Sequence, residues 1–261
     1  MSNKFYIIAI VIAVIMILII SVVSIPMRQS LAPAKPLSPE EIACYDFLKR
    51  EMPLFEDYVG KKQPSQVTMV EFQYNYSVTG AGFSVLKALP NLEELNCHKA
   101  HSLNDSFSDC LQYLPKLKTL NLTGTEVTPK SLPNIAKLKQ LKYLRIIRHY
   151  SRVEDMAQWK PEDTFTDASL EILTECNQLE HLYIGEPCNI SDAGLEHLKN
   201  LPNLKYLGIV TDQVTPQGIE FLKSLPHIKE IVVGKPSGKF SMIVNGDQRI
   251  QYHVSHTGAT P

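Results

Sequence analysis

The sequence has almost no net charge and no basic stripe. Its 261 residues include 26 Lys and Arg against 27 Asp and Glu, which gives a formal net charge of -1. Proteins that bind nucleic acid usually concentrate Lys and Arg on one face. We therefore expect no nucleic-acid partner.

The sequence also lacks the short motifs that mark common catalytic sites. It has no GxSxG, no HExxH and no Gly-rich loop of the kind that cradles phosphate. Four histidines have no nucleophile or second metal ligand at a suitable spacing: His149, His181, His197 and His227. We predict that the protein is not an enzyme and that it uses no cofactor, no metal and no small-molecule substrate.

What the chain does contain is an internal repeat. Residues 78–92, VTGAGFSVLKALPNL, recur as residues 190–204, ISDAGLEHLKNLPNL. Each copy ends on a motif of the form LxxLxL, and spacings of 24 or 25 residues separate most successive motifs, with one spacing of 38. This periodicity indicates a repeat array. The seven motifs begin at Val67, Leu92, Leu117, Leu141, Leu179, Leu204 and Ile228.

Each unit is typical of one strand followed by one short helix. The motif alternates apolar and polar residues, as a strand with one buried face does. A Thr, Ser or Asn then stands where a helix would begin, and Pro129 and Pro216 follow two of these residues at the first helical position. One unit buries too little apolar surface to fold alone, so the units must stack. The expected N-caps are Thr79, Asn104, Thr128, Thr166, Ser191 and Thr215.

On these motifs, residues 67–233 resemble a leucine-rich repeat protein. The continuation LNLTGTEVTPKSL is similar to the LxLxxTxVTDxGLxxL repeats of many bacterial members and to the ribonuclease-inhibitor-like branch. The resemblance implies an α/β solenoid, with a curved parallel sheet of about seven strands on its concave side and short helices on its convex side. Cys97 and Cys176 occupy Leu positions of the repeat and are expected to be small buried hydrophobes. The odd number of five cysteines leaves disulfides possible, but we predict none.

Residues 5–25 form a stretch of Ile, Val and other uncharged residues. As a helix it would be about 31 Å long, which matches the thickness of a bilayer core. We predict a single-pass membrane anchor over residues 1–28, with the repeats on the extracytoplasmic side; a cleaved signal peptide is the alternative. The other predicted parts are a Pro-containing tether at 29–37, a helical cap at 38–66, a β-hairpin cap at 234–254 and a disordered tail at 255–261.

The predicted binding site lies on the concave face, at the third and fifth positions of the LxxLxL motifs. Three adjacent strands present Tyr143, Arg145, His181, Tyr183 and Tyr206 there. Tyr and Arg are enriched at the energetic centres of protein interfaces. Tyr also suits an exposed strand surface by propensity and cross-strand stacking, so both interpretations remain open.

An insert at residues 147–164 accounts for the one long spacing. It contains Trp159, the only Trp in the chain. Insertions in a solenoid leave from one edge and often serve binding, so we include Trp159 among the candidate partner-binding residues. The alternative is that Trp159 folds back over the edge of the sheet.

Three classes of function are compatible with this organisation. The first, which we favour, is a membrane-tethered recognition module whose concave face binds a protein or peptide. The second is a structural or self-associating envelope protein. The third, which the membrane span and the lack of an adaptor domain disfavour, is a substrate-receptor subunit of a larger complex.

Overall fold

The structure is a computed structural model, and it describes residues 35–148, 160–234, 239–244 and 251–254. The predicted anchor, residues 29–34 of the tether, the tail and Trp159 lie outside these ranges. Within them, no helix is long and apolar enough to cross a membrane. Leu37–Pro261 form one compact unit, separate from Met1–Pro36.

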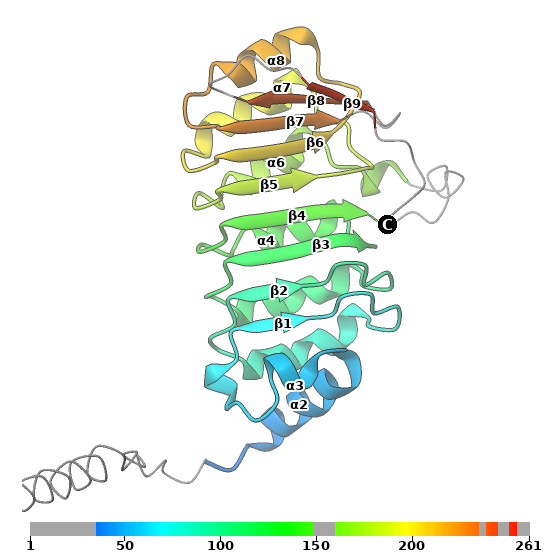
Figure 1. The fold of residues 1–261 in the computed structure, drawn as a ribbon, viewed down its shortest axis with the longest axis vertical. Coiled ribbons are helices and arrows are strands. Elements are labelled where there is room, and N and C mark those ends of the chain that lie inside the picture. The colour runs from blue at the N-terminus through cyan, green and yellow to red at the C-terminus, as the bar shows by residue number, and fades with distance from the viewer. Residues whose placement is uncertain (1–34, 149–159, 235–238, 245–250, 255–261) are drawn as a thin grey trace, which may run out of the picture. The chain divides into compact units, whose positions relative to one another are not determined.

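The compact unit is built on one sheet whose nine described strands follow the order of the chain (Figure 1). The first seven strands are parallel, and the last two are antiparallel to their neighbours. The strands are β1 (Met69–Glu71), β2 (Glu94–Asn96), β3 (Thr119–Thr125), β4 (Tyr143–Arg148), β5 (His181–Ile184), β6 (Tyr206–Val210), β7 (Glu230–Gly234), β8 (Lys239–Val244) and β9 (Gln251–Val254).

The register of the parallel strands matches the LxxLxL motifs. Leu120 of β3 pairs with Leu144 of β4, which pairs with Leu182 of β5. These fourth positions are fully buried, whereas the third and fifth positions of the same strands are half-buried. Each motif therefore supplies one core-facing residue between two residues on the other face.

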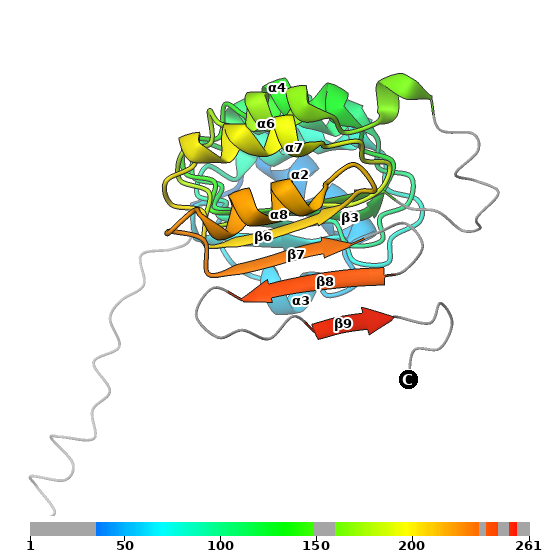
Figure 2. The ribbon, with the colours of Figure 1, turned by 90° about the horizontal axis from the view of Figure 1, so that it is seen from above.

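Short helices follow the strands and lie together on one side of the sheet (Figure 2). Several of them are 3₁₀ rather than α helices, a difference that the repeat pattern did not predict. The helices of the repeats are η2 (Gly80–Ala88), η3 (Asp105–Tyr113), η4 (Pro129–Ser131), α4 (Leu132–Ile135), α6 (Asp167–Leu173), α7 (Asp192–Leu195), η6 (Glu196–Asn200) and α8 (Pro216–Lys223). All six expected N-cap residues occupy the N-cap position of one of these elements.

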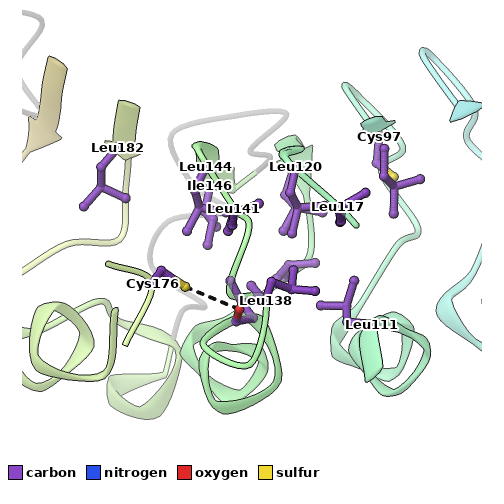
Figure 3. Packing of buried hydrophobic residues seen from close by; sticks show 14 of the residues in the cluster. Cys97, Leu111, Leu117, Leu120, Leu138, Leu141, Leu144, Ile146, Cys176 and Leu182 are labelled. Atoms are coloured by element: carbon purple, nitrogen blue, oxygen red, sulfur yellow. Dashed lines mark hydrogen bonds between the residues drawn. The ribbon is translucent and has the colours of Figure 1, made fainter. Parts of the chain in front are cut away.

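The hydrophobic core fills the space between the sheet and the helices (Figure 3). Its buried residues run from Cys44 to Val233, so residues 37–261 contain a complete core of their own. All five cysteines are free and buried. Cys97 and Cys176 lie inside the core as expected, and the Cys176 thiol lies 3.5 Å from the carbonyl oxygen of Ile135.

The first repeat is covered by helix α2 (Pro39–Glu51). Its start is a capping box, because Glu41 N–H donates to Ser38 Oγ and Ser38 N–H donates to Glu41 Oε2. Phe47 packs edge-on against Phe72 and Phe83 of the first repeat. The cap contains two helices, because α2 stops before Pro53, which cannot continue a helix, and α3 (Phe55–Tyr58) is separate.

Carboxylates link the starts of successive repeats. Asp105 accepts hydrogen bonds from the backbone and hydroxyl of Thr128, at 2.8 and 2.7 Å. Asp167 binds Ser191 in the same way, and Asp192 binds Thr215. Each of these carboxylates therefore holds the N-cap of the next repeat.

The insert begins two residues later than predicted, because Ile147 and Arg148 belong to β4 and pair with β3. The buried guanidinium of Arg148 contacts Glu126 Oε2 at 2.7 Å and Asp163 Oδ2 at 3.6 Å. Asp163 belongs to η5 (Pro161–Asp163), where the described part of the insert rejoins the fold. Arg148 therefore fixes the two ends of the insert against the third repeat.

Candidate partner-binding face

The side of the sheet opposite the helices carries the third and fifth residues of every motif, and we call it the open face. These residues form two rows across the strands, because each pairs in register with its counterparts on the neighbouring strands. One row is Met69, Glu94, Thr119, Tyr143, His181, Tyr206 and Glu230, and the other is Glu71, Asn96, Asn121, Arg145, Tyr183, Gly208 and Val232.

The structure brings four of the predicted site residues into one aromatic cluster on β4, β5 and β6. The rings of His181 and Tyr206 are stacked, with centroids 4.3 Å apart and an interplanar angle of 9°. Tyr143 lies 5.6 Å from His181 and 5.9 Å from Tyr183. All four side chains are half-buried. The cluster thus offers apolar ring faces held by mutual contact, with little side-chain freedom left to lose on binding.

Arg145 completes the cluster. Its guanidinium carbon lies 5.5 Å from the centroid of the Tyr183 ring, a cation–π distance. Its Nε atom is buried and has no hydrogen-bond partner among the described residues. No carboxylate in the described part of the chain forms an ion pair with Arg145 within 4.0 Å.

The surroundings of the cluster shift the acidity of two members. Desolvation is the largest effect on His181 and lowers its pKa, which favours the neutral imidazole. Desolvation also raises the pKa of Tyr183, and the neighbouring Tyr143 acts in the same direction. At neutral pH His181 and Tyr183 therefore present uncharged rings beside the Arg145 guanidinium.

Glu180 lies between two lysines, and these three residues come directly before the first residues of β4, β5 and β6. Lys142 Nζ is 2.9 Å from its carboxylate, and Lys205 binds the other oxygen. Hydrogen bonds from Lys205 and Lys142 lower the pKa of Glu180 to about 2. Glu180 therefore stays ionised, and one carboxylate is shared by two cations.

The opposite end of the open face differs. Asn96 donates to Glu71 Oε1 at 2.8 Å, Gln73 also donates to it, and a hydrogen bond that Tyr58 donates to the Glu71 carboxylate raises the pKa of Tyr58. Because the Glu71 carboxylate already has these hydrogen-bond partners, a further hydrogen bond from a ligand would stabilise it less. The predicted site and this end of the sheet are therefore distinct in chemistry.

Sequence reasoning missed a second aromatic group at the ends of β1 and β2. Tyr74 lies 5.6 Å from His98, Tyr76 lies 4.6 Å from His101, and Lys99 Nζ lies 4.8 Å above the Tyr74 ring. These residues follow the strands in loops where the motif has no fixed pattern. Their proximity depends on backbone turns, including positive φ angles at Tyr74 and Lys99.

The described residues contain no group of three or more His, Cys, Asp or Glu side chains that could hold a metal ion. A depression of about 320 Å³ lies on the helix side between η2 and η3, lined in part by Ser84, Asp109 and Tyr113. The sixth predicted site residue, Trp159, lies outside the described residues, so its relation to the aromatic cluster stays a prediction.

Seven LxxLxL motifs in register form parallel strands, and short helices follow the first six; this arrangement defines a leucine-rich repeat solenoid. No family model and no curated protein matches the chain. Among solved structures, internalin C2 of Listeria monocytogenes is 15% identical with a TM-score of 0.38, covering 77% of this chain and all of that one.

Two other solved structures show weaker similarity. A Bacteroides fragilis protein is 16% identical with a TM-score of 0.30, covering 75% of this chain and 72% of its own. The internalin InlF of Listeria monocytogenes is 17% identical with a TM-score of 0.22, covering 75% of each chain. The assignment of the fold rests on the repeats and the sheet of this chain.

Proposed function

We propose that this solenoid is a non-catalytic recognition module and that the open face over β4, β5 and β6 binds a segment of a partner protein. The observation that carries the proposal is the cluster of Tyr143, His181, Tyr183 and Tyr206 beside Arg145. These side chains are packed against one another in advance, so binding costs them little conformational entropy. Large aromatic side chains and Arg also contribute most of the binding energy in many protein interfaces.

The experiment compares three baits made from the fragment Leu37–Pro261, which contains the whole described core. One bait is the unaltered fragment, the second carries Tyr143→Ala, Arg145→Ala and Tyr183→Ala, and the control carries Tyr113→Ala. Tyr113 is 49% exposed on the helix side, away from the open face. Each bait is incubated with membrane-depleted extract of the cell that makes the protein.

The proposal expects one protein to be retained by the unaltered and control baits and lost by the triple variant. Purified partner should then bind the triple variant at least tenfold more weakly, while the circular-dichroism melting curves of all three baits agree. Equal retention by all baits would contradict a binding site on this face. Concentration-dependent self-association that is unaffected by the three substitutions would instead favour the structural alternative.

The proposal includes a membrane tether formed by residues 5–25, with the repeats outside the cytoplasm. The length and apolar character of this stretch support the membrane tether. The alternative, a cleaved signal peptide, is disfavoured because the sequence matches the signal-peptide pattern only in part. The finer assignment of the repeats to the bacterial or ribonuclease-inhibitor-like type rests on the LxLxxTxVT pattern alone.

Extraction of cell membranes at high pH tests the tether. The full chain should stay in the membrane pellet, and the fragment Leu37–Pro261 should be released. Protease added outside intact cells or spheroplasts should digest the repeats if they are extracytoplasmic. Release of the intact full chain would contradict the anchor, and protection of the repeats would reverse the orientation.

A further inference from the structure

The charges on and beside the open face are divided between its two ends. At the second, third and fifth positions of the motifs, β1 and β2 have Glu71, Glu93 and Glu94 and no cation. The β3 motif adds one cation, Lys118, which pairs with Glu93 at 2.8 Å, so the first three motifs have a net charge of -2. Strands β4 to β7 carry four cations and two carboxylates, a net charge of +2: Lys142, Arg145, Lys205 and Lys229 against Glu180 and Glu230.

Within the cationic half, Arg145 is the group with the most to gain from an anion. Its buried Nε has no partner among the described residues, and its guanidinium lies on the Tyr183 ring. A buried donor without a partner is costly, and a carboxylate would satisfy it with a charge-assisted hydrogen bond. By contrast, Lys142 and Lys205 both pair with Glu180. Because two cations share one carboxylate, this group keeps an excess positive charge.

We infer that the partner segment bound at the aromatic cluster is acidic, with an Asp or Glu side chain on the Arg145 guanidinium and further carboxylates near Lys205 and Lys229. This inference rests on the proposed function and specifies the chemistry of its partner. Lys142 on β4 and Lys229 on β7 are three strands apart, or roughly 14 Å at the usual strand spacing. One carboxylate cannot reach both, so several acidic side chains fit this surface better than a single chain terminus.

The anionic half explains why the acidic segment should bind at one end only. Glu71 and Glu94 would repel carboxylates placed over β1 and β2, whereas Glu93 is paired with Lys118. A segment that runs across the strands would therefore place its acidic residues over β4 to β7. Complementary charge of this kind sets the register and orientation of a partner as well as its rate of association.

The test uses a display library of random 12-residue peptides, selected on immobilised Leu37–Pro261. Parallel selections use Arg145→Gln, Arg145→Glu, the pair Tyr143→Ala with Tyr183→Ala, and Lys137→Glu. Lys137 is exposed on the helix side, and Lys137→Glu changes the net charge by the same amount as Arg145→Glu. The readout is the frequency of Asp and Glu against Lys and Arg in the selected peptides.

The unaltered fragment and Lys137→Glu should both enrich Asp and Glu at least twofold over the starting library. Arg145→Glu should lose that enrichment and select Lys or Arg instead. The best peptide from the first selection should bind Arg145→Gln at least tenfold more weakly, and its affinity should fall as salt is raised.

Three outcomes would overturn the inference, and they differ in what else they refute. Selected peptides that require Tyr143 and Tyr183 but contain no excess of Asp or Glu would refute the acidic partner and leave the recognition function standing. Equal effects of Arg145→Glu and Lys137→Glu would likewise refute it, because net charge alone would then govern binding. Absence of any peptide that depends on the two tyrosines would contradict the proposed function itself.

Discussion

The ring of Tyr183 occupies the space that a side chain on Gly208 would need. A β-carbon at Gly208 would lie 2.4 Å from Tyr183 Cδ1 and 3.0 Å from its Cε1. The two residues are paired across β5 and β6. The missing side chain on β6 thus lets the Tyr183 ring lie over the neighbouring strand, within reach of Arg145 and Tyr143.

Replacement of Gly208 by Ala should therefore displace the Tyr183 ring without removing any part of it. The ring lies on the open face and not in the core, so the loss in free energy of unfolding should be near the lower end for overpacking, about 1 kcal/mol. Affinity for the partner or a selected peptide should fall at least fivefold. Urea unfolding and fluorescence anisotropy measure the two effects, and unchanged affinity would show that the ring position is irrelevant to binding.

The Asp167→Ala variant tests the links between repeats. It removes two hydrogen bonds, of 2.7 Å each, to the backbone and hydroxyl of Ser191. We expect the free energy of unfolding to drop by about 1 to 3 kcal/mol, because the Ser191 groups lose their partner in a partly buried place. The control is Asp212→Ala at an exposed position, which should change stability by less than about 0.5 kcal/mol. Equal effects of the two changes would contradict the linking role.

The Gly194→Ala variant probes the same link from the other side. A β-carbon there would lie 2.2 Å from Asp167 Oδ1, so Asp167 would have to leave Ser191. Gly194→Ala should destabilise the protein by about 1 to 3 kcal/mol. In a double-mutant cycle, Gly194→Ala should lower the free energy of unfolding of the Asp167→Ala variant clearly less than that of the unaltered protein. Additive effects measured by urea unfolding would show that the clash with Asp167 is unimportant.

The lysine pair around Glu180 predicts a specific pH dependence. Because the pKa of Glu180 is lowered to about 2 in the folded protein, its contribution to stability is present above the ordinary pKa of 4.5 and is lost as pH falls toward 2. Urea midpoints of the unaltered fragment and Glu180→Gln should differ slightly at pH 7 and converge near pH 2. The difference should shrink in high salt, since these side chains are exposed to solvent. A difference that grows on acidification would contradict the assignment.

The five thiols should be unreactive in the folded protein. All of them are buried, and burial raises the pKa of Cys44, Cys110, Cys176 and Cys188 to about 12. Only the thiolate reacts readily with a disulfide reagent. Titration of Leu37–Pro261 with such a reagent should therefore detect five thiols in denaturant and none within minutes under native conditions. Fast reaction of one thiol would show that its part of the core opens.

The sequence was sufficient to predict the strands because the LxxLxL spacing directly encodes one buried face. The same spacing placed Tyr143, Arg145, His181, Tyr183 and Tyr206 on the open face, since the third and fifth positions must lie opposite the buried Leu. It also identified N-caps such as Thr128, whose side-chain chemistry is local.

Other features could not be predicted because they depend on contacts between repeats. Asp167 meets Ser191 only when two units stack, and nothing within one unit requires a carboxylate at that position. The fit of the Tyr183 ring over Gly208 likewise depends on the registration of β5 and β6. The break at Pro53 is different, because a proline is itself a local signal for the end of a helix.

Photo-crosslinking in the cell that makes the protein tests the central claim most directly. A photoreactive amino acid replaces Thr119 or Val232, which flank the aromatic cluster on β3 and β7, or Tyr113 on the helix side. Both open-face positions should crosslink the full chain to the same partner, which Tyr113 should not capture, and Arg145→Glu should abolish the product. Capture of that partner from Tyr113 alone, or equally from all three positions, would contradict recognition by the open face.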